Sequence, residues 1–264
     1  LLVYGGGSVI KSGLLDRVKN ALTEAGVQYA EWGGVKPNPR LAHAQKGIAF
    51  AIKENVDFVL AVGGGSSIDT AKGIAHGAAN PEVNLWDIWT KKVSLEKSLP
   101  IGVVLTISAA GSEMSDSAVL TNEEIGKKSG LGTPFNRPKF AIMNPELTYT
   151  LPKYQIACGI ADIMMHTLER YFIPNQKNRL TDEIAEGVLR TVIDNGRIAV
   201  KKEKRGLHLG EKIVLELLRK AKEDKNIDDF ILYTTTSKIS FIVSLLSNFL
   251  HTYSLFFKKE KLSR

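Results

Sequence analysis

The chain has 264 residues, of which 44% are hydrophobic and 24% charged, a composition typical of globular proteins and not of disordered or fibrous chains. Its formal net charge of +7 is concentrated in residues 201–264, which carry +6, whereas residues 1–200 carry only +1. The basic balance is therefore a property of the tail and does not indicate a nucleic-acid-binding protein.

A single cysteine, Cys158, excludes an intrachain disulfide and fits a reducing compartment. Its apolar surroundings favour a buried structural thiol over a nucleophile. The chain opens directly on an expected strand with no basic stretch before it, so we expect no signal peptide, a cytoplasmic protein and a missing preceding segment. The uncharged run 239–257 just reaches the length of a membrane span, but polar residues dilute it, which favours a packed helix or an ill-ordered tail.

Strand and helix patterns alternate along the first part of the chain. Short apolar runs predict strands at 1–4, 27–31, 57–62, 100–105 and 139–143, and apolar residues at helical spacing predict helices at 13–25, 41–54 and 67–79. This order predicts an α/β fold with a parallel sheet covered by helices, whose ligands bind at the carboxyl ends of the strands. Two long helices are then expected at 153–172 and 180–200, with a domain boundary near residue 148.

Two matching glycine-rich turns each follow an apolar strand. The first is Tyr-Gly-Gly-Gly-Ser at 4–8, and the second is Val-Gly-Gly-Gly-Ser at 62–66, which continues to Asp69 and Lys72. Glycines let the backbone approach an anion, and the helix that follows offers free amides and the positive end of its dipole. Either turn alone would also fit an ordinary loop with a helix cap, but the presence of both favours a cofactor with several phosphates. The small polar stretch 106–117 is expected to form a third loop on the same rim, although a plain serine-rich connection would read the same way.

A pair of metal-binding residue types opens the helical part. Asp162 and His166 are four residues apart on the expected helix and therefore share one face. They could hold a divalent ion if two or more further ligands completed its shell, whereas spacing alone fits a surface Asp–His pair equally well. Apolar neighbours such as Ile163 and Met164 suggest an internal face, which favours a site.

With these motifs in place, residues 1–200 resemble the iron-containing alcohol dehydrogenases, and among them the branch of NADPH-dependent aldehyde reductases and butanol dehydrogenases. The resemblance rests on motifs in the family's order and spacing, namely 4–8, Gly-Gly-Val-Lys-Pro-Asn-Pro at 33–39, 61–66 with Asp69 and Lys72, Gly-Ser-Glu at 111–113, Asn-Pro at 144–145, Thr-Tyr-Thr-Leu-Pro at 148–152 and Asp-x-x-x-His-Thr-x-Glu at 162–169. The family fold implies a Rossmann-like dinucleotide-binding domain over 1–147 and the start of an all-helical metal-binding domain over 148–200, an architecture shared with dehydroquinate synthase. Residues 201–264 would be a divergent basic helical tail.

The resemblance also implies roles for individual residues. The expected cofactor-binding residues are Gly6, Gly7 and Ser8 beside the adenosine ribose, Gly63, Gly64, Gly65 and Ser66 at the pyrophosphate with Asp69 as their companion, and Asn38, Thr106 and Lys128 along the groove. Gly64 is expected to lie against the pyrophosphate, where a β-carbon would intrude. NAD-using relatives carry an acidic residue at the position of Gly7, so its absence favours NADP(H).

The implied reaction is reversible hydride transfer between NADP(H) and a primary alcohol or aldehyde, with iron or zinc bound by Asp162, His166 and two further histidines. His208 and His251 follow in the sequence, but their surroundings do not resemble the family, and the chain departs from it near residue 201 as a truncated or frameshifted copy would. We therefore expect weak or absent metal and impaired activity.

Two other classes of function remain open. One is a catalytically inactive nucleotide-binding remnant of the same family, and the other, resting only on the tail, is a membrane-tethered or nucleic-acid-binding adaptor. The expected partners are a small alcohol or aldehyde substrate and, as an option, a second copy in a homodimer, with no nucleic acid and no membrane.

Overall fold

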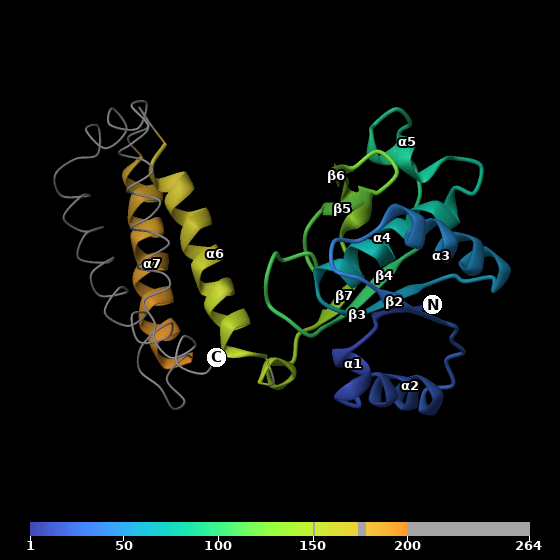
Figure 1. The fold of residues 1–264 in the computed structure, drawn as a ribbon, viewed down its shortest axis with the longest axis horizontal. Coiled ribbons are helices and arrows are strands. Elements are labelled where there is room, and N and C mark those ends of the chain that lie inside the picture. Colours follow the sequence, from blue (N-terminus) through green and yellow to red (C-terminus); the bar gives the residue numbers. More distant parts are fainter. Residues whose placement is uncertain (150, 174–177, 200–264) are drawn as a thin grey trace, which may run out of the picture. The chain divides into compact units, whose positions relative to one another are not determined.

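The computed structural model describes residues 1–149, 151–173 and 178–199 (Figure 1). The chain divides into two compact units, Leu1–Thr150 and Leu151–Arg264. The expected tail over 201–264 and the apolar run 239–257 lie outside the described residues. Among the helices that are described, none is long and apolar enough to cross a membrane.

The first unit is built on a parallel sheet. Its strands, within the described residues, follow the order β2-β1-β3-β4-β7, and each neighbouring pair is parallel. The elements of this unit are β1 Leu2–Gly5, α1 Ser8–Lys11, α2 Leu14–Glu24, β2 Glu31–Val35, α3 Leu41–Lys53, β3 Val59–Gly63, α4 Gly65–Ala79, α5 Leu85–Trp89, β4 Ile101–Leu105, β5 Ser117–Asn122, β6 Lys127–Gly132, η1 Pro134–Asn136, β7 Phe140–Ile142 and η2 Pro145–Thr148. The predicted α/β class with a parallel sheet is confirmed.

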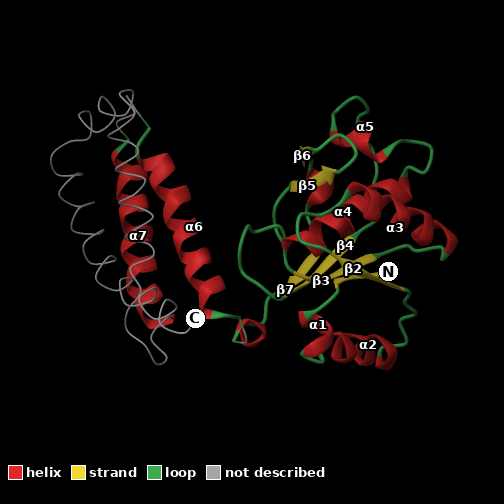
Figure 2. Cartoon of the chain, viewed as in Figure 1, coloured by secondary structure: helices red, strands yellow, loops and turns green. Residues whose placement is uncertain are grey.

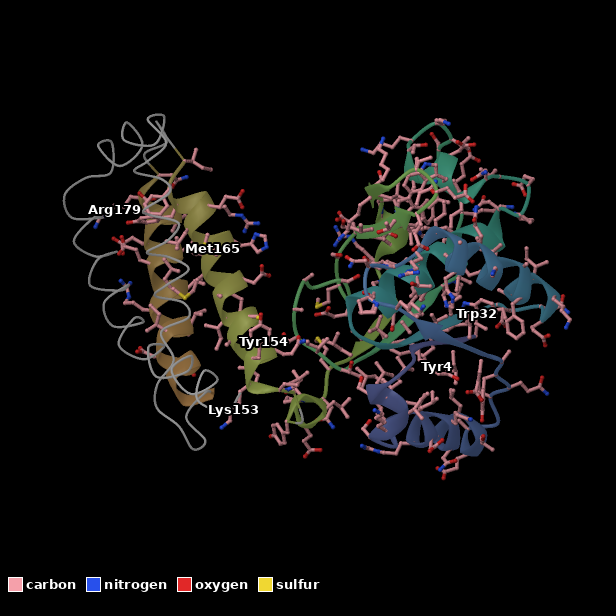
Figure 3. The ribbon with its side chains drawn as sticks, viewed as in Figure 1. Tyr4, Trp32, Lys153, Tyr154, Met165 and Arg179 are labelled. Carbon is pink, nitrogen blue, oxygen red and sulfur yellow. The ribbon has the colours of Figure 1, made fainter. Side chains whose placement is uncertain are left out.

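Helices cover both faces of this sheet, with α1 and α2 on one face and α3 and α4 on the other (Figure 2). Side chains alternate between the faces along each strand. Ala61 and Val103 join the larger core beneath α3, α4 and α5, whereas Val62 and Val104 join a smaller core with Val9 of α1. On the neighbouring strands Tyr4 and Trp32 likewise point to opposite faces (Figure 3). Because the central strands are covered on both sides, their sequences read as continuous apolar runs.

The second strand begins later than the sequence predicts. The structure places β2 at Glu31–Val35, not at 27–31. Gly26 has φ +68°, and the Val27 amide donates to the Leu22 carbonyl at 2.9 Å, so the chain is still closing the end of α2 at this point. Val27, the apolar residue at the start of the expected strand, therefore belongs to that turn.

A hairpin between β4 and β7 was not predicted from the sequence. Strands β5 and β6 pair antiparallel, from Ser117 opposite Gly132 to Asn122 opposite Lys127. One face of the hairpin is buried through Ala118, Leu120 and Leu131, which extend the larger core. The hairpin thus covers α4 and brings its turn next to α3, where Arg40 forms an ion pair with Glu123 at 2.9 Å.

A buried histidine links this hairpin region to α4. His76 is fully buried, with Nδ1 2.7 Å from Ser98 Oγ and Nε2 2.8 Å from Asn136 Oδ1. Burial lowers the pKa of His76 to about 4, so the ring is neutral at neutral pH. His76 is therefore a packing residue of the first unit.

The second unit contains two long helices among its described residues, α6 Lys153–Tyr171 and α7 Arg179–Ala199. They pack through Ala157, Ile160 and Met164 of α6 and Leu189 and Ile193 of α7. Other apolar side chains of α6 are exposed, among them Tyr154 and Met165 (Figure 3).

The prediction that Cys158 is buried is wrong. Cys158 is exposed, because the packed face of α6 is formed by the neighbouring Ala157 and by Ile160.

Candidate dinucleotide-binding site

The first glycine turn follows β1 at the carboxyl edge of the sheet. Gly5 pairs with Val35 of β2, and the chain then passes through Gly6 and Gly7 into α1, which begins at Ser8. A β-carbon on Gly7 would meet no atom within 4 Å. The turn therefore borders open space at Gly7, a residue that the family resemblance assigns to the adenosine ribose.

The second glycine turn joins β3 to the fifteen-residue helix α4. A β-carbon on Gly63 would lie 2.6 Å from Ser67 Oγ, so close packing requires glycine there. Gly64 is the N-cap of α4, and Gly65 and Ser66 form its first turn, with amides that donate to no acceptor in the described part of the chain. Free amides at the start of a long helix are an anion-binding arrangement.

Of these glycines, Gly65 faces the open space. A β-carbon on Gly64 would lie 2.5 Å from Ile107 Cγ2, whereas one on Gly65 would meet nothing within 4 Å. A β-carbon on Gly64 would therefore first displace Ile107, and its expected intrusion on the pyrophosphate stays a prediction.

The stretch 106–116 forms a loop beside this turn. β3 and β4 pair in register from Val59 opposite Ile101 to Gly63 opposite Leu105, and the Thr106 amide donates to the Gly63 carbonyl at 3.1 Å. Thr106 is thus held next to the second glycine turn, as the prediction of a third loop on the same rim requires.

A buried lysine anchors the far part of this loop. Lys72 of α4 is fully buried, and its Nζ donates to the Ser112 carbonyl at 2.7 Å, to Ser112 Oγ at 3.1 Å and to the Ser117 carbonyl at 2.8 Å. Burial lowers the pKa of Lys72 to about 8, and the charge of Asp69 opposes that shift. The ammonium group ties the segment between β4 and β5 to α4.

Asp69 completes the same network. Its carboxylate accepts hydrogen bonds from Ser112 Oγ at 2.6 Å and from the Val119 amide at 3.1 Å. Burial raises the pKa of Asp69, and these two donors and Lys72 oppose the rise. Asp69 therefore positions the loop through Ser112 and Val119, and its expected place as the companion of the pyrophosphate turn stays a prediction.

Asn38 and Lys128, both predicted to line the groove, lie side by side. Lys128 Nζ of β6 donates to Asn38 Oδ1 at 3.2 Å, although 90 residues separate them. Asn38 has φ +58°, in the left-handed region that asparagine tolerates better than most residues. The unpredicted β5–β6 hairpin is what brings this lysine to the loop between β2 and α3.

Asp162 and His166 lie on one face of α6 but not in an internal site. His166 Nε2 is 3.7 Å from Asp162 Oδ2, and the two side chains are 64% and 65% exposed. The prediction of an internal face is wrong for the described structure, because Ile160 and Met164 point to α7 while Asp162 and His166 point away from it. Among the described residues, no group of three or more His, Cys, Asp or Glu side chains could hold a metal ion.

Lys72 and Ser112 both occur in motifs of the sequence, but neither is assigned a role from the sequence alone. One signal was present for Lys72, since a lysine stands between Ala71 and Ile74 on a helix whose neighbours are apolar. A lysine in such a position is buried only where acceptors surround its charge. Its partners at 112 and 117 could not be deduced without the fold.

Comparisons with known proteins agree with the resemblance seen in the sequence. The family model of the iron-containing alcohol dehydrogenases matches residues 1–145. NADH-dependent butanol dehydrogenase A of Clostridium acetobutylicum is 46% identical over 202 residues, which are 76% of this chain and 52% of that protein. The NADPH-dependent aldehyde reductase YqhD of Escherichia coli is 39% identical over 203 residues, again 76% of this chain and 52% of that protein.

Solved structures show the same relationship. The crystal structure of NADH-dependent butanol dehydrogenase A from Thermotoga maritima superposes with a TM-score of 0.71 at 42% identity, covering 76% of this chain and 50% of that one. The chain thus spans about half the length of the relatives it matches. The matched family model covers more than half of the chain, including both glycine turns and the loop 106–116. The chain belongs to the iron-containing alcohol dehydrogenase family.

Proposed function

We propose that the chain binds a nicotinamide dinucleotide at the carboxyl edge of its sheet and serves hydride transfer between NADP(H) and a primary alcohol or aldehyde. The observation that carries the proposal is the pair of glycine turns on the adjacent parallel strands β1 and β3, which border open space at Gly7 and Gly65. Ligands of open parallel sheets bind at this edge.

In this proposal the described residues bind and orient the cofactor. The amides of Gly65 and Ser66 at the start of α4 would hold the pyrophosphate, with Gly63 and Gly64 making the tight turn, and Gly6, Gly7 and Ser8 would face the adenosine ribose. Thr106 and the Asn38–Lys128 pair would line the groove beside them. When bound, the cofactor supplies the hydride chemistry.

The choice between NADP(H) and NAD(H) is proposed from the first turn. Relatives named for each cofactor match the chain at 46% and 39% identity, so their names do not decide between the two. Gly7 and Ser8 carry no negative charge that would repel a ribose 2′-phosphate, which favours NADP(H).

Replacing Gly7 with aspartate is expected to reverse this preference. The open space at Gly7 can accept the side chain, and a carboxylate there would repel the 2′-phosphate and accept hydrogen bonds from the ribose hydroxyls of NADH. We expect the wild-type chain to bind NADPH more tightly than NADH and Gly7→Asp to weaken NADPH by about tenfold or more. Fluorescence titration of both nucleotides measures this, and equal affinities in the wild type would remove the assignment of NADP(H).

The metal centre implied by the family is not complete within the described residues. Asp162 and His166 offer one carboxylate and one imidazole, and a stable site for iron or zinc needs further ligands. The described residues alone therefore do not form a metal centre.

The metal content of the purified chain distinguishes the proposed enzyme from its alternative, an inactive nucleotide-binding remnant. We expect the purified chain to retain little iron or zinc and to reduce aldehydes far more slowly than a complete family member, as elemental analysis and a turnover assay can measure. One equivalent of metal that is lost in His166→Ala would instead favour the full enzyme.

A further inference from the structure

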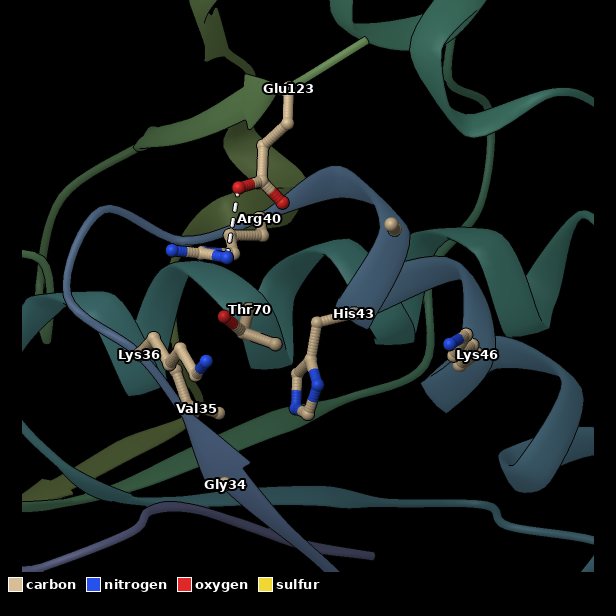
Figure 4. A pocket seen from close by; sticks show the side chains of 9 residues that line it. Gly34, Val35, Lys36, Arg40, His43, Lys46, Thr70 and Glu123 are labelled. Atoms are coloured by element: carbon tan, nitrogen blue, oxygen red, sulfur yellow. Dashed lines mark ion pairs between the residues drawn. The ribbon is translucent and has the colours of Figure 1, made fainter.

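A basic cavity lies on the first unit between the end of β2, the start of α3 and the middle of α4. Its volume is about 190 Å³, and its lining includes Lys36, Arg40, His43, Lys46, Thr70 and Glu123 (Figure 4). None of these residues belongs to the predicted cofactor set. The cavity has room for a small polyatomic ion or a single substituent group.

The lining carries an excess of positive charge. Arg40 pairs with Glu123 at 2.9 Å, which leaves Lys36 and Lys46 without an ion-pair partner in the part of the chain that the structure describes. Burial lowers the pKa of His43, and the charges of Lys46 and Lys36 lower it further, so both lysines act on the interior of the cavity. An anion placed there would meet two unpaired ammonium groups.

Hydrogen-bond donors accompany this charge. Ala42 and His43 stand in the first turn of α3, a thirteen-residue helix whose N-cap, Arg40, provides no side-chain cap, and their amides donate to no described acceptor. His43 Nε2 itself is shielded from solvent and therefore does not face the cavity. The free amides and the two lysines together form a donor set suited to a phosphate group.

The cavity also adjoins the first glycine turn. Gly34 forms part of its lining, and the Gly34 Cα lies 3.9 Å from the position that a β-carbon on Gly6 would take. The cavity therefore begins beside the turn at which the adenosine ribose is proposed to lie.

We propose that this cavity binds the phosphate group of a phosphate monoester or a free phosphate ion, with Lys36 and Lys46 as its principal cationic contacts. If the source is a nucleotide, the group is the 2′-phosphate of NADP(H), and this part of the inference rests on the proposed function. Lys36 and Lys46 then supply the positive charge that Gly6, Gly7 and Ser8 do not.

The test uses the full chain and three probes, NADPH, NADH and inorganic phosphate, each titrated by calorimetry. Lys36→Gln/Lys46→Gln removes both unpaired cations, and Lys53→Gln, at an exposed lysine near the end of the same helix, is the matched control. We expect the double variant to weaken NADPH by about tenfold with NADH unchanged, or to abolish phosphate binding, while the control changes neither.

The outcomes distinguish the two sources. Selective loss of NADPH affinity assigns the ribose phosphate, and loss of phosphate binding with both nucleotides unaffected assigns a free ion. If neither nucleotide binds the wild type, the proposed function fails. The titration with inorganic phosphate then decides alone whether the cavity binds a phosphate group. The inference is overturned if the double variant matches the control with every probe, or if NADPH and NADH weaken equally and phosphate binding is unchanged.

Discussion

Replacing Lys72 with methionine is expected to lower the free energy of unfolding by about 3–5 kcal/mol. Methionine keeps most of the apolar stem but removes the ammonium group that donates hydrogen bonds to the oxygens of Ser112 and Ser117. The change would leave Asp69 ionised and largely buried without its neighbouring cation. Urea denaturation followed by circular dichroism measures the loss.

The control for this experiment is Lys53→Met, because the Lys53 side chain is 78% exposed. Its effect should stay within about 0.5 kcal/mol, as for most surface substitutions. A loss below about 1 kcal/mol in Lys72→Met would mean that the network around Asp69 and Ser112 contributes little to the fold.

Replacing Gly65 with valine is expected to weaken the binding of NADPH and NADH alike by about a hundredfold or more, equivalent to about 2.7 kcal/mol. The side chain would fill the open space in front of the first turn of α4, where the free amides of Gly65 and Ser66 would meet the pyrophosphate. Because the added β-carbon would meet no atom within 4 Å beyond the adjacent residues and the backbone of its own helix, the fold should persist. Fluorescence titration gives the affinities.

The matched control is Gly187→Val, at a helical glycine of α7 that also has nothing within 4 Å of an added β-carbon. It should bind both nucleotides as the wild type does. Unchanged affinity in a folded Gly65→Val variant would make the second glycine turn purely structural.

The parts of this fold that could be predicted are those with a local signal. An apolar strand that ends in glycines, such as the strand ending at Gly63, predicts both a strand of the sheet and the edge at which ligands bind. Glycine is favoured there because the chain turns sharply and an anion can approach its backbone closely. The helices α3, α4, α6 and α7 were found within a few residues of their observed bounds, since apolar residues recur at helical spacing in each.

The parts that could not be predicted depend on long-range pairing. The β5–β6 hairpin has strands of six residues and a turn at Gly126, and only its packing over α4 shows which face is buried. Lys72 reaches Ser112 and Ser117 across 40 and 45 residues, a contact that no local pattern contains.

The buried face of α6 could not be predicted for a related reason. Apolar residues occur on more than one side of α6. Ile163 is 46% exposed, yet it is as apolar as Ile160, which packs on α7. Hydrophobicity around Asp162 therefore did not reveal which side of the helix is buried.

The most direct test of the proposed function is a calorimetric titration of the folded wild-type chain with NADPH and with NADH. Binding at the two glycine turns predicts saturable binding with one site per chain and a higher affinity for NADPH. The absence of saturable binding for both nucleotides would contradict the proposal that this edge of the sheet is a dinucleotide site.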